Sequence, residues 1–289
     1  MKRIYFLICL AILVYQQGFS QSAKEEVKKE LKAPWFVEKY RASIGGFIPV
    51  SNTNLQVSAT GANHTIGTDI DFEDDLGFNR TSETFLADFQ YSLTRRSRFD
   101  LSYTQLNRTA TKTLQKDIIF DEDTFHVNNQ TAAFFNTGIY RFSYGYSIIT
   151  NTKFEIGLLF GFHILHANAG LSSVGNSANL ALSKDFGFTA PLPDFGIWGG
   201  YAFSDRWSVN GEFDYFSIKI GDIKGEIVGA QLGVTFRAYK KLDIIAGYSG
   251  FHFNVNVSKP HAYGSLSWGY SGPSLAVSYS FGKKGWSSN

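Results

Sequence analysis

The stretch "SLAVSYSF", from Ser274 to Phe281, alternates small and bulky side chains. Leu275, Val277, Tyr279 and Phe281 occupy the odd positions, and serine or alanine occupies the even ones. Successive side chains of a strand point to opposite faces, so the stretch predicts a strand with one apolar face and one small polar face. The apolar face would point inward in a soluble sandwich and outward to lipid in a membrane barrel. The fold depends on which of the two holds.

The same alternation recurs along the chain. The clearest further segments cover residues 84–93, 140–148, 154–164, 207–215 and 228–237. A period of two that is sustained over about ten segments indicates a protein built of strands.

The connections between these segments alternate in length. Short turns at 94–97, 150–152, 204–206 and 240–241 are separated by longer polar gaps near 60–80, 109–130, 170–186 and 256–271, and by a shorter gap at 221–225. Barrels of the bacterial outer membrane have short periplasmic turns and longer outer loops. The chain is therefore predicted to be all-β, an antiparallel transmembrane β-barrel of about ten strands with up-and-down hairpin topology over residues 37–282. Eight or twelve strands would also fit the spacing.

Residue types favour lipid as the partner of the apolar faces. These faces are rich in Phe and Tyr, whereas the opposite faces carry glycines such as Gly157 and Gly229, which suit a crowded lumen. Aromatic residues near the turns fit the interfacial girdle of a barrel, namely Trp35, Tyr146, Phe203, Trp207 and Tyr239. We therefore expect the chain to lie in the outer membrane.

The N-terminal residues predict export. Lys2 and Arg3 precede an apolar run and small residues, which is the pattern of a signal peptide over residues 1–20. A charged periplasmic leader (21–36) follows, and residues 283–289 form a periplasmic tail. Removing the signal peptide reduces 27 basic residues to 25, against 25 acidic ones, so nothing favours nucleic-acid binding. It also removes the single cysteine, Cys9, and with it any disulfide.

The export signal, the hairpin pattern and the aromatic last strand resemble the family of small outer-membrane β-barrel proteins of Gram-negative bacteria. The resemblance covers about residues 38–281, and its most specific local features are "TDIDFEDDLGF" (68–78) and "GPSLAVSYSF" (272–281). It implies a surrounding of outer-membrane lipid and lipopolysaccharide, and recognition of the last strand by the barrel-insertion machinery through Phe281. The chain departs from the family pattern where "GKKGWSSN" follows Phe281. Nothing in the sequence indicates an oligomeric state.

Charged residues on the predicted inner faces form the first candidate site. They are Asp88, Asp100, Arg108, Arg141, Glu155, Asp194, Glu212, Asp214 and Arg237. Isolated charges inside a barrel are costly, so we expect a network of paired charges that largely fills the lumen. The alternative is a narrow channel for small solutes or ions, in which Glu212 and Asp214 would control conductance.

The acidic part of residues 68–78 is the second candidate. Asp69, Asp71, Glu73, Asp74 and Asp75 are dense enough to form a cation-binding loop, although their spacing does not match an EF-hand. The alternative is a solvated acidic loop with a helical turn at 72–78.

The histidines do not predict a metal site. His163 and His166 are three residues apart and would point to opposite faces of a strand. His163 is expected in the lumen, and His252 is expected to point inward after a bulge at Gly250. No cofactor is predicted.

Motifs of hydrolases are missing from the sequence, which contains no G-x-S-x-G, H-E-x-x-H or phosphate-binding glycine loop. The nearest acid-rich segment with a histidine is "FDEDTFH", with Asp121, Asp123 and His126 in a predicted outer loop. A hydrolase at the barrel rim is therefore the weakest of three hypotheses. The leading one is a non-enzymatic barrel whose outer loops bind a ligand or partner.

Overall fold

The computed structural model describes residues 32–57, 67–120, 123–173, 183–259 and 262–288. The predicted signal peptide and most of the charged leader lie outside these residues. The strands are β1 (Lys32–Ala33), β2 (Tyr40–Phe47), β3 (Val50–Val57), β4 (Ile70–Asp71), β5 (Thr84–Ser92), β6 (Ser97–Thr113), β7 (Ile118–Phe120), β8 (Asp123–Phe125), β9 (Gln130–Thr150), β10 (Phe154–Ser173), β11 (Ser183–Ala202), β12 (Trp207–Ile220), β13 (Ile223–Tyr239), β14 (Leu242–Lys259), β15 (Ala262–Phe281) and β16 (Ser287–Ser288). No helix in the described residues is long and apolar enough to span a membrane.

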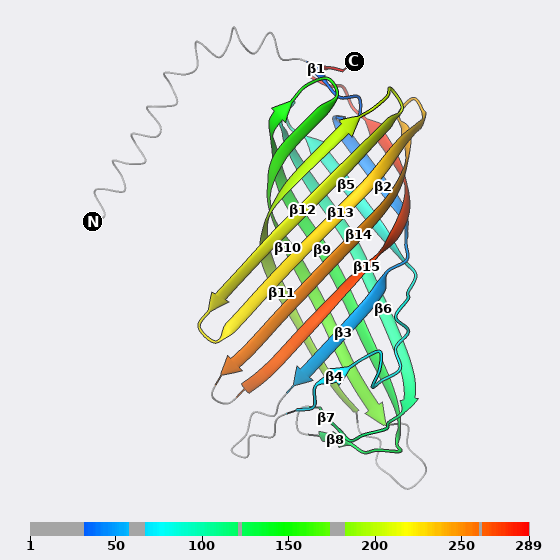
Figure 1. Cartoon of the computed structure of the whole chain (residues 1–289), viewed down its shortest axis with the longest axis vertical. Coiled ribbons are helices and arrows are strands. Elements are labelled where there is room, and N and C mark those ends of the chain that lie inside the picture. Colours follow the sequence, from blue (N-terminus) through cyan, green and yellow to red (C-terminus); the bar gives the residue numbers. More distant parts are fainter. Residues whose placement is uncertain (1–31, 58–66, 121–122, 174–182, 260–261, 289) are drawn as a thin grey trace, which may run out of the picture.

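Ten strands close into a ring (Figure 1). The ring consists of β2, β5, β6 and β9 to β15, and each strand pairs antiparallel with its neighbours. The pairing of β15 with β2 closes the ring. β3 continues β2 along β15 after a break at residues 48–49. The prediction of an antiparallel barrel of about ten strands is confirmed. We call the end with the chain termini and short turns the periplasmic end, and the opposite end the outer end.

A belt of exposed apolar side chains surrounds the periplasmic half of the barrel. Each of the ten strands contributes to it, for example with Ile44, Phe89, Leu101, Phe142, Leu158, Ile197, Phe213, Leu232, Ile244 and Val277. A wall of this kind is stable only against lipid. In this half, the apolar face of the strands therefore meets the membrane, as predicted.

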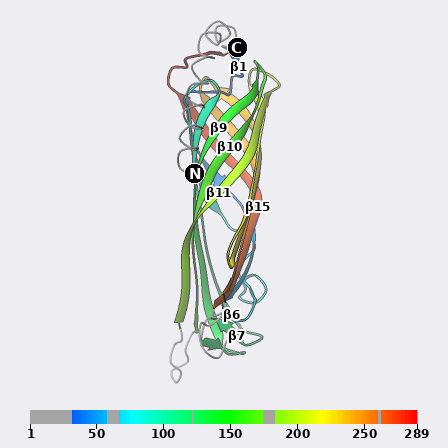
Figure 2. The ribbon, with the colours of Figure 1, turned by 90° about the vertical axis from the view of Figure 1, so that its left-hand side faces the viewer.

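The strands run much farther toward the outer end than the sequence suggested. β9 has 21 residues and β15 has 20, and both run along most of the barrel in the two views (Figures 1 and 2). The gaps predicted at 109–130, 170–186 and 256–271 are therefore wrong in part, because much of each is strand.

The reason is that the apolar residues change faces along the strands. On β15, Leu275 and Val277 point to lipid, whereas Leu266 and Trp268 are buried inside the barrel. The pairing of β15 with β14 continues without a shift between these residues, so the strand itself does not change phase. The outer half thus has apolar residues inside and polar residues outside, the pattern of a protein wall that faces water.

This inversion corrects the expectation for His252. Gly250 pairs in register with Ala230 and Ser271, so it forms no bulge. Phe251 and Phe253 are buried in the barrel and His252 is exposed outside it. The prediction was wrong because it assumed that lipid surrounds the whole length of β14.

The buried apolar residues of the outer half form one core, which we call the outer core. It contains Leu55, Phe72, Leu106, Phe135, Leu165, Phe253 and Trp268 among others. The Trp268 ring packs on the Phe135 and Phe251 rings at centroid distances of 5.7 and 5.9 Å. The outer core thus joins inward-facing rings of different strands, with Phe135 of β9 on Trp268 of β15 and Phe188 of β11 on Phe253 of β14.

A second, smaller core lies at the periplasmic end, and we call it the periplasmic core. It consists of Ala33, Trp35, Phe36, Val37, Ala202 and Trp286. β1 pairs with β16 in parallel, which brings the leader and the tail together over the barrel mouth. Trp35 is buried here and donates a hydrogen bond from Nε1 to the Ser204 carbonyl at 2.8 Å, so its assignment to the girdle was wrong. The other four predicted girdle residues are exposed on the wall.

Candidate functional site

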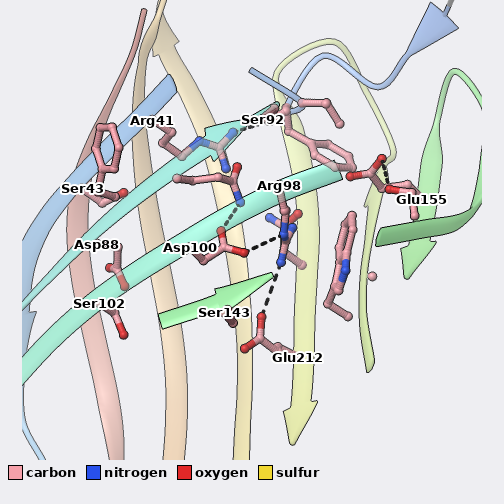
Figure 3. A pocket seen from close by; sticks show the side chains of 18 of the residues that line it. Arg41, Ser43, Asp88, Ser92, Arg98, Asp100, Ser102, Ser143, Glu155 and Glu212 are labelled. Atoms are coloured by element: carbon pink, nitrogen blue, oxygen red, sulfur yellow. Dashed lines mark hydrogen bonds and ion pairs between the residues drawn. The ribbon is translucent and has the colours of Figure 1, made fainter. Parts of the chain in front are cut away.

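A polar chamber occupies the lumen between the two cores. It comprises two adjoining cavities of about 190 and 160 Å³ that share lining residues, among them Ser43, Asp88, Ser102, Arg141 and Glu212. Figure 3 shows carboxylates and guanidinium groups from several strands pointing into this space. Phe36 lines its periplasmic end, and Phe251 and Tyr270 line its outer end.

Two arginines hold four of the acids around the chamber. Arg141 contacts Asp194 at 3.3 Å and Asp214 at 3.0 Å, and it also pairs with Glu212. Arg98 reaches Asp100 at 2.9 Å and Glu212 at 3.5 Å, and we call these six residues the chamber cluster. Glu212 thus joins the two arginines in one network.

Glycines of the inner face provide room for this network. The Arg98 guanidinium stacks 3.6 Å from the centre of the Trp198 ring. The indole in turn covers Gly157, where an added Cβ would lie 2.6 Å from the Trp198 Nε1 atom. Any side chain at 157 would therefore displace Trp198 and, with it, the stacked guanidinium.

The nine predicted lumen charges all lie on inner faces, but they form four groups instead of one. Five of them belong to the chamber cluster, namely Asp100, Arg141, Asp194, Glu212 and Asp214. Asp88 lines the same chamber but forms no ion pair with any residue in the described part of the chain. Toward the periplasm, Glu155 pairs with Arg95 at 2.7 Å, and Arg237 pairs with Asp243 at 2.8 Å and with Glu38 at 3.1 Å. Arg108 lies in the outer half and pairs with Glu73 at 2.6 Å.

Sequence reasoning missed Arg98 and Glu38. Arg98 follows the short turn at 94–97 and is two residues before Asp100, so strand alternation alone would have placed both in the lumen. Glu38 was assigned to the start of the wall, yet it is buried at the periplasmic mouth, where Lys284 of the tail reaches it at 3.0 Å. No local pattern indicates that contact.

The acidic segment does not gather its five carboxylates around one point. Asp74 pairs with Arg80 and Asp75 pairs with Lys116, while Asp69 is exposed. Among the described residues, these acids form no group of three with ligand atoms close enough for a metal ion. The structure does contain the predicted helical turn, since the Asp75 amide donates to the Asp71 carbonyl at 2.7 Å.

The segment instead closes a gap in the barrel wall. β5 pairs with β6 only as far as Leu86 and Thr104, whereas β6 continues to Thr113. Residues 67–83 fill the space between the outer part of β6 and β3, visible beside β4 in Figure 1. Phe72, Leu76 and Phe78 of this segment enter the outer core.

Glu73 fastens the segment to both neighbouring strands. Its Oε2 accepts a hydrogen bond from the Thr53 amide of β3 at 2.9 Å, and its Oε1 contacts Arg108 of β6. Both charged side chains are almost completely buried, with 1% and 3% of their side-chain surface exposed. Glu73 is therefore a structural residue of the wall.

The predicted rim residues form a separate surface feature. Asp121 lies outside the described residues, and Asp123 belongs to the short hairpin of β7 and β8. His126 lies 3.6 Å from Asp117 on the exposed end of this hairpin. The hydrogen bond from the Val127 amide lowers the pKa of the Asp117 carboxyl, and the contact with His126 lowers it further. The hydrogen bond from Val127 shows that Asp117 closes the hairpin.

Comparison with known proteins places the fold. No family model and no curated protein matches the sequence. Among solved structures, the outer-membrane protease OmpT from Escherichia coli is similar with a TM-score of 0.55 and 9% identity, over 84% of this chain and 96% of that one. The toluene transporter TodX of Pseudomonas putida has a TM-score of 0.35 and 13% identity, over 84% of this chain and 89% of that one. The attachment invasion locus protein Ail of Yersinia pestis has a TM-score of 0.31 and 11% identity, over 82% of this chain and 99% of that one. The OmpT likeness and the apolar belt agree that this chain folds as a transmembrane β-barrel of the outer-membrane type.

Proposed function

We propose that this protein is a non-enzymatic, non-conducting outer-membrane barrel that acts through its outer half. The observation that carries the proposal is the outer core, which places packed apolar side chains at the level where a channel would need a polar path. The periplasmic core covers the other mouth with Trp35, Phe36 and Trp286. The charges between the two cores are held mainly in ion pairs, which supports a stabilising role for them.

The exposed side chains of the outer wall favour the sugar part of lipopolysaccharide as the binding partner. Above the apolar belt, the wall presents exposed neutral side chains that include Asn52, Asn107, Thr109, Thr111 and Asn136, which we call the polar collar. Amides and hydroxyls donate and accept hydrogen bonds, as sugar hydroxyls do. The collar also adjoins the lipid belt, so it stands at the height of the sugars that lipid A carries.

Conductance separates the closed barrel from the channel alternative. We expect the refolded chain to give no discrete current steps in a planar bilayer, because ions would have to pass the packed apolar side chains of the outer core. Circular dichroism and migration of the unheated protein on a gel would establish that the barrel is folded. Steps from the folded barrel, especially steps whose size changes in Glu212→Gln, would contradict the proposal and indicate a narrow channel.

Stability in defined vesicles tests the collar. We expect rough lipopolysaccharide, which carries core sugars, to raise the urea midpoint of unfolding more than lipid A alone does. Replacing the five collar residues with alanine should remove most of this difference, since each lost hydrogen bond costs about 0.5–1.5 kcal/mol. The matched control replaces the exposed residues Lys153 and Asp205 at the periplasmic turns. Equal stabilisation of the collar variant and the control would overturn the sugar assignment without affecting the closed-barrel proposal.

A further inference from the structure

Three side chains from three consecutive strands meet at the outer end of the chamber. They are His163 of β10, Asp194 of β11 and Asp214 of β12. Each offers a ligand atom, and these atoms all lie within 4.8 Å of one another. The three residues are only 4%, 1% and 5% exposed. Imidazole nitrogen and carboxylate oxygen are the ligands of many divalent transition-metal sites.

Each of these residues also has a polar atom that is almost completely buried. The atoms are His163 Nδ1, Asp194 Oδ1 and Asp214 Oδ2, and the two aspartate oxygens accept no hydrogen bond from the described residues. His163 Nδ1 lies 3.2 Å from Asp194 Oδ2, so the imidazole is already paired with one of the two carboxylates. Buried polar atoms are normally satisfied, so the two free aspartate oxygens leave these carboxylates with unused capacity for a ligand.

The charge balance points the same way. The chamber cluster joins four carboxylates, those of Asp100, Asp194, Glu212 and Asp214, to the two guanidinium groups of Arg98 and Arg141. If every group is ionised, the cluster carries an excess of two negative charges. Arg41 also lines the chamber, and a divalent cation beside the two aspartates would offset the negative charge of the cluster itself.

The wall is shaped to bring the two carboxylates inward. An added Cβ at Gly161 would lie 2.7 Å from Asp194 Oδ1, and one at Gly229 would lie 2.0 Å from Asp214 Oδ2. Each aspartate therefore rests against a glycine of the neighbouring strand, where any larger residue would displace it. The two glycines therefore leave the space that these carboxylates occupy on the inner face.

We propose that His163, Asp194 and Asp214 bind one divalent transition-metal ion of the zinc type inside the barrel. Around such an ion, nitrogen and oxygen ligands lie about 2.0–2.2 Å from the metal and so about 3.3–3.6 Å from each other. The 3.2 Å contact of His163 with Asp194 is slightly shorter than this spacing, and the ligand atoms of all three residues lie within 4.8 Å of one another. Arg141 keeps its bonds to both aspartates, and the adjoining cavity supplies water for the remaining coordination position.

The test uses the untagged, refolded full barrel with Zn²⁺ and Co²⁺ as probes. Calorimetry should show one Zn²⁺ per chain, and Co²⁺ should give visible absorption bands of a low-coordinate site. His163→Ala should weaken binding by more than the about 10–100-fold that loss of an outer-shell partner costs. Asp214→Asn, which keeps the volume of the side chain, should weaken it similarly and serves as the second variant if His163→Ala does not fold.

Two matched controls make the outcome specific. His166 lies on the same strand three residues away and is exposed outside the barrel, and Asp88 is a carboxylate of the same chamber outside the proposed site. His166→Ala and Asp88→Asn should both bind Zn²⁺ as the unmodified chain does. No stoichiometric binding to the unmodified chain, or binding that survives in both His163→Ala and Asp214→Asn, would overturn the proposal.

Discussion

Replacing Glu73 with alanine is expected to lower the free energy of unfolding by about 3–5 kcal/mol. The substitution leaves the Arg108 guanidinium buried without its partner, and it removes the acceptor of the Thr53 amide. Both losses fall on the segment that fills the wall between β3 and β6. Urea unfolding in lipopolysaccharide-free vesicles, followed by tryptophan fluorescence, measures the change.

Asp74 provides the control from the same helical turn. Its ion pair with Arg80 is exposed, with 73% of the Asp74 side-chain surface accessible, so Asp74→Ala should cost no more than about 1 kcal/mol. A double variant, Glu73→Leu with Arg108→Met, should recover most of the lost stability because it leaves no buried charge. If Glu73→Ala and Asp74→Ala were equally mild, residues 67–83 would not be docked in the wall as described.

The second large effect is expected at the lipid-facing wall. Leu101→Arg should destabilise the barrel by about 2–4 kcal/mol, the cost of a cation near the middle of the bilayer. Leu101 is 49% exposed and lies in the apolar belt on β6. The measurement is again the free energy of unfolding in vesicles.

Thr109→Arg is the matched substitution on the same strand. Thr109 points outward as Leu101 does, but it lies past the level at which the apolar residues change faces. Its replacement should change the stability by less than about 0.5 kcal/mol, since it stands in water. Similar costs at the two positions would mean that the bilayer covers the outer half as well.

The sequence predicted the barrel because alternation and turn spacing are local signals. Residues 274–281 and the turns at 94–97 and 240–241 contain the relevant pattern within a few positions. The length of the strands was missed for a physical reason. In the outer half, Phe251 and Phe253 alternate with polar residues just as lipid-facing residues do, and alternation alone does not say which solvent lies outside.

The site was predictable in part for a similar reason. Strand alternation places a side chain in the lumen, and all nine predicted charges lie there. The partner of each charge depends on which strands face each other across the barrel. Glu73 and Arg108 are 35 residues apart, and Arg237 and Glu38 are 199 apart, so only the closed structure pairs them.

The change of faces along the long strands has a consequence for their alignment. A strand that slipped by one residue would turn every side chain over, placing the belt residues in the lumen and the outer-core residues in water. A slip of two residues would keep the faces but raise the point of change by about 6–7 Å, out of level with its neighbours. A misaligned strand would thus lose stability both in the lipid-facing half and in the water-facing half of the barrel. On β15, the change of faces between Trp268 and Leu275 therefore determines both the register of the strand in the barrel and the depth of the barrel in the bilayer.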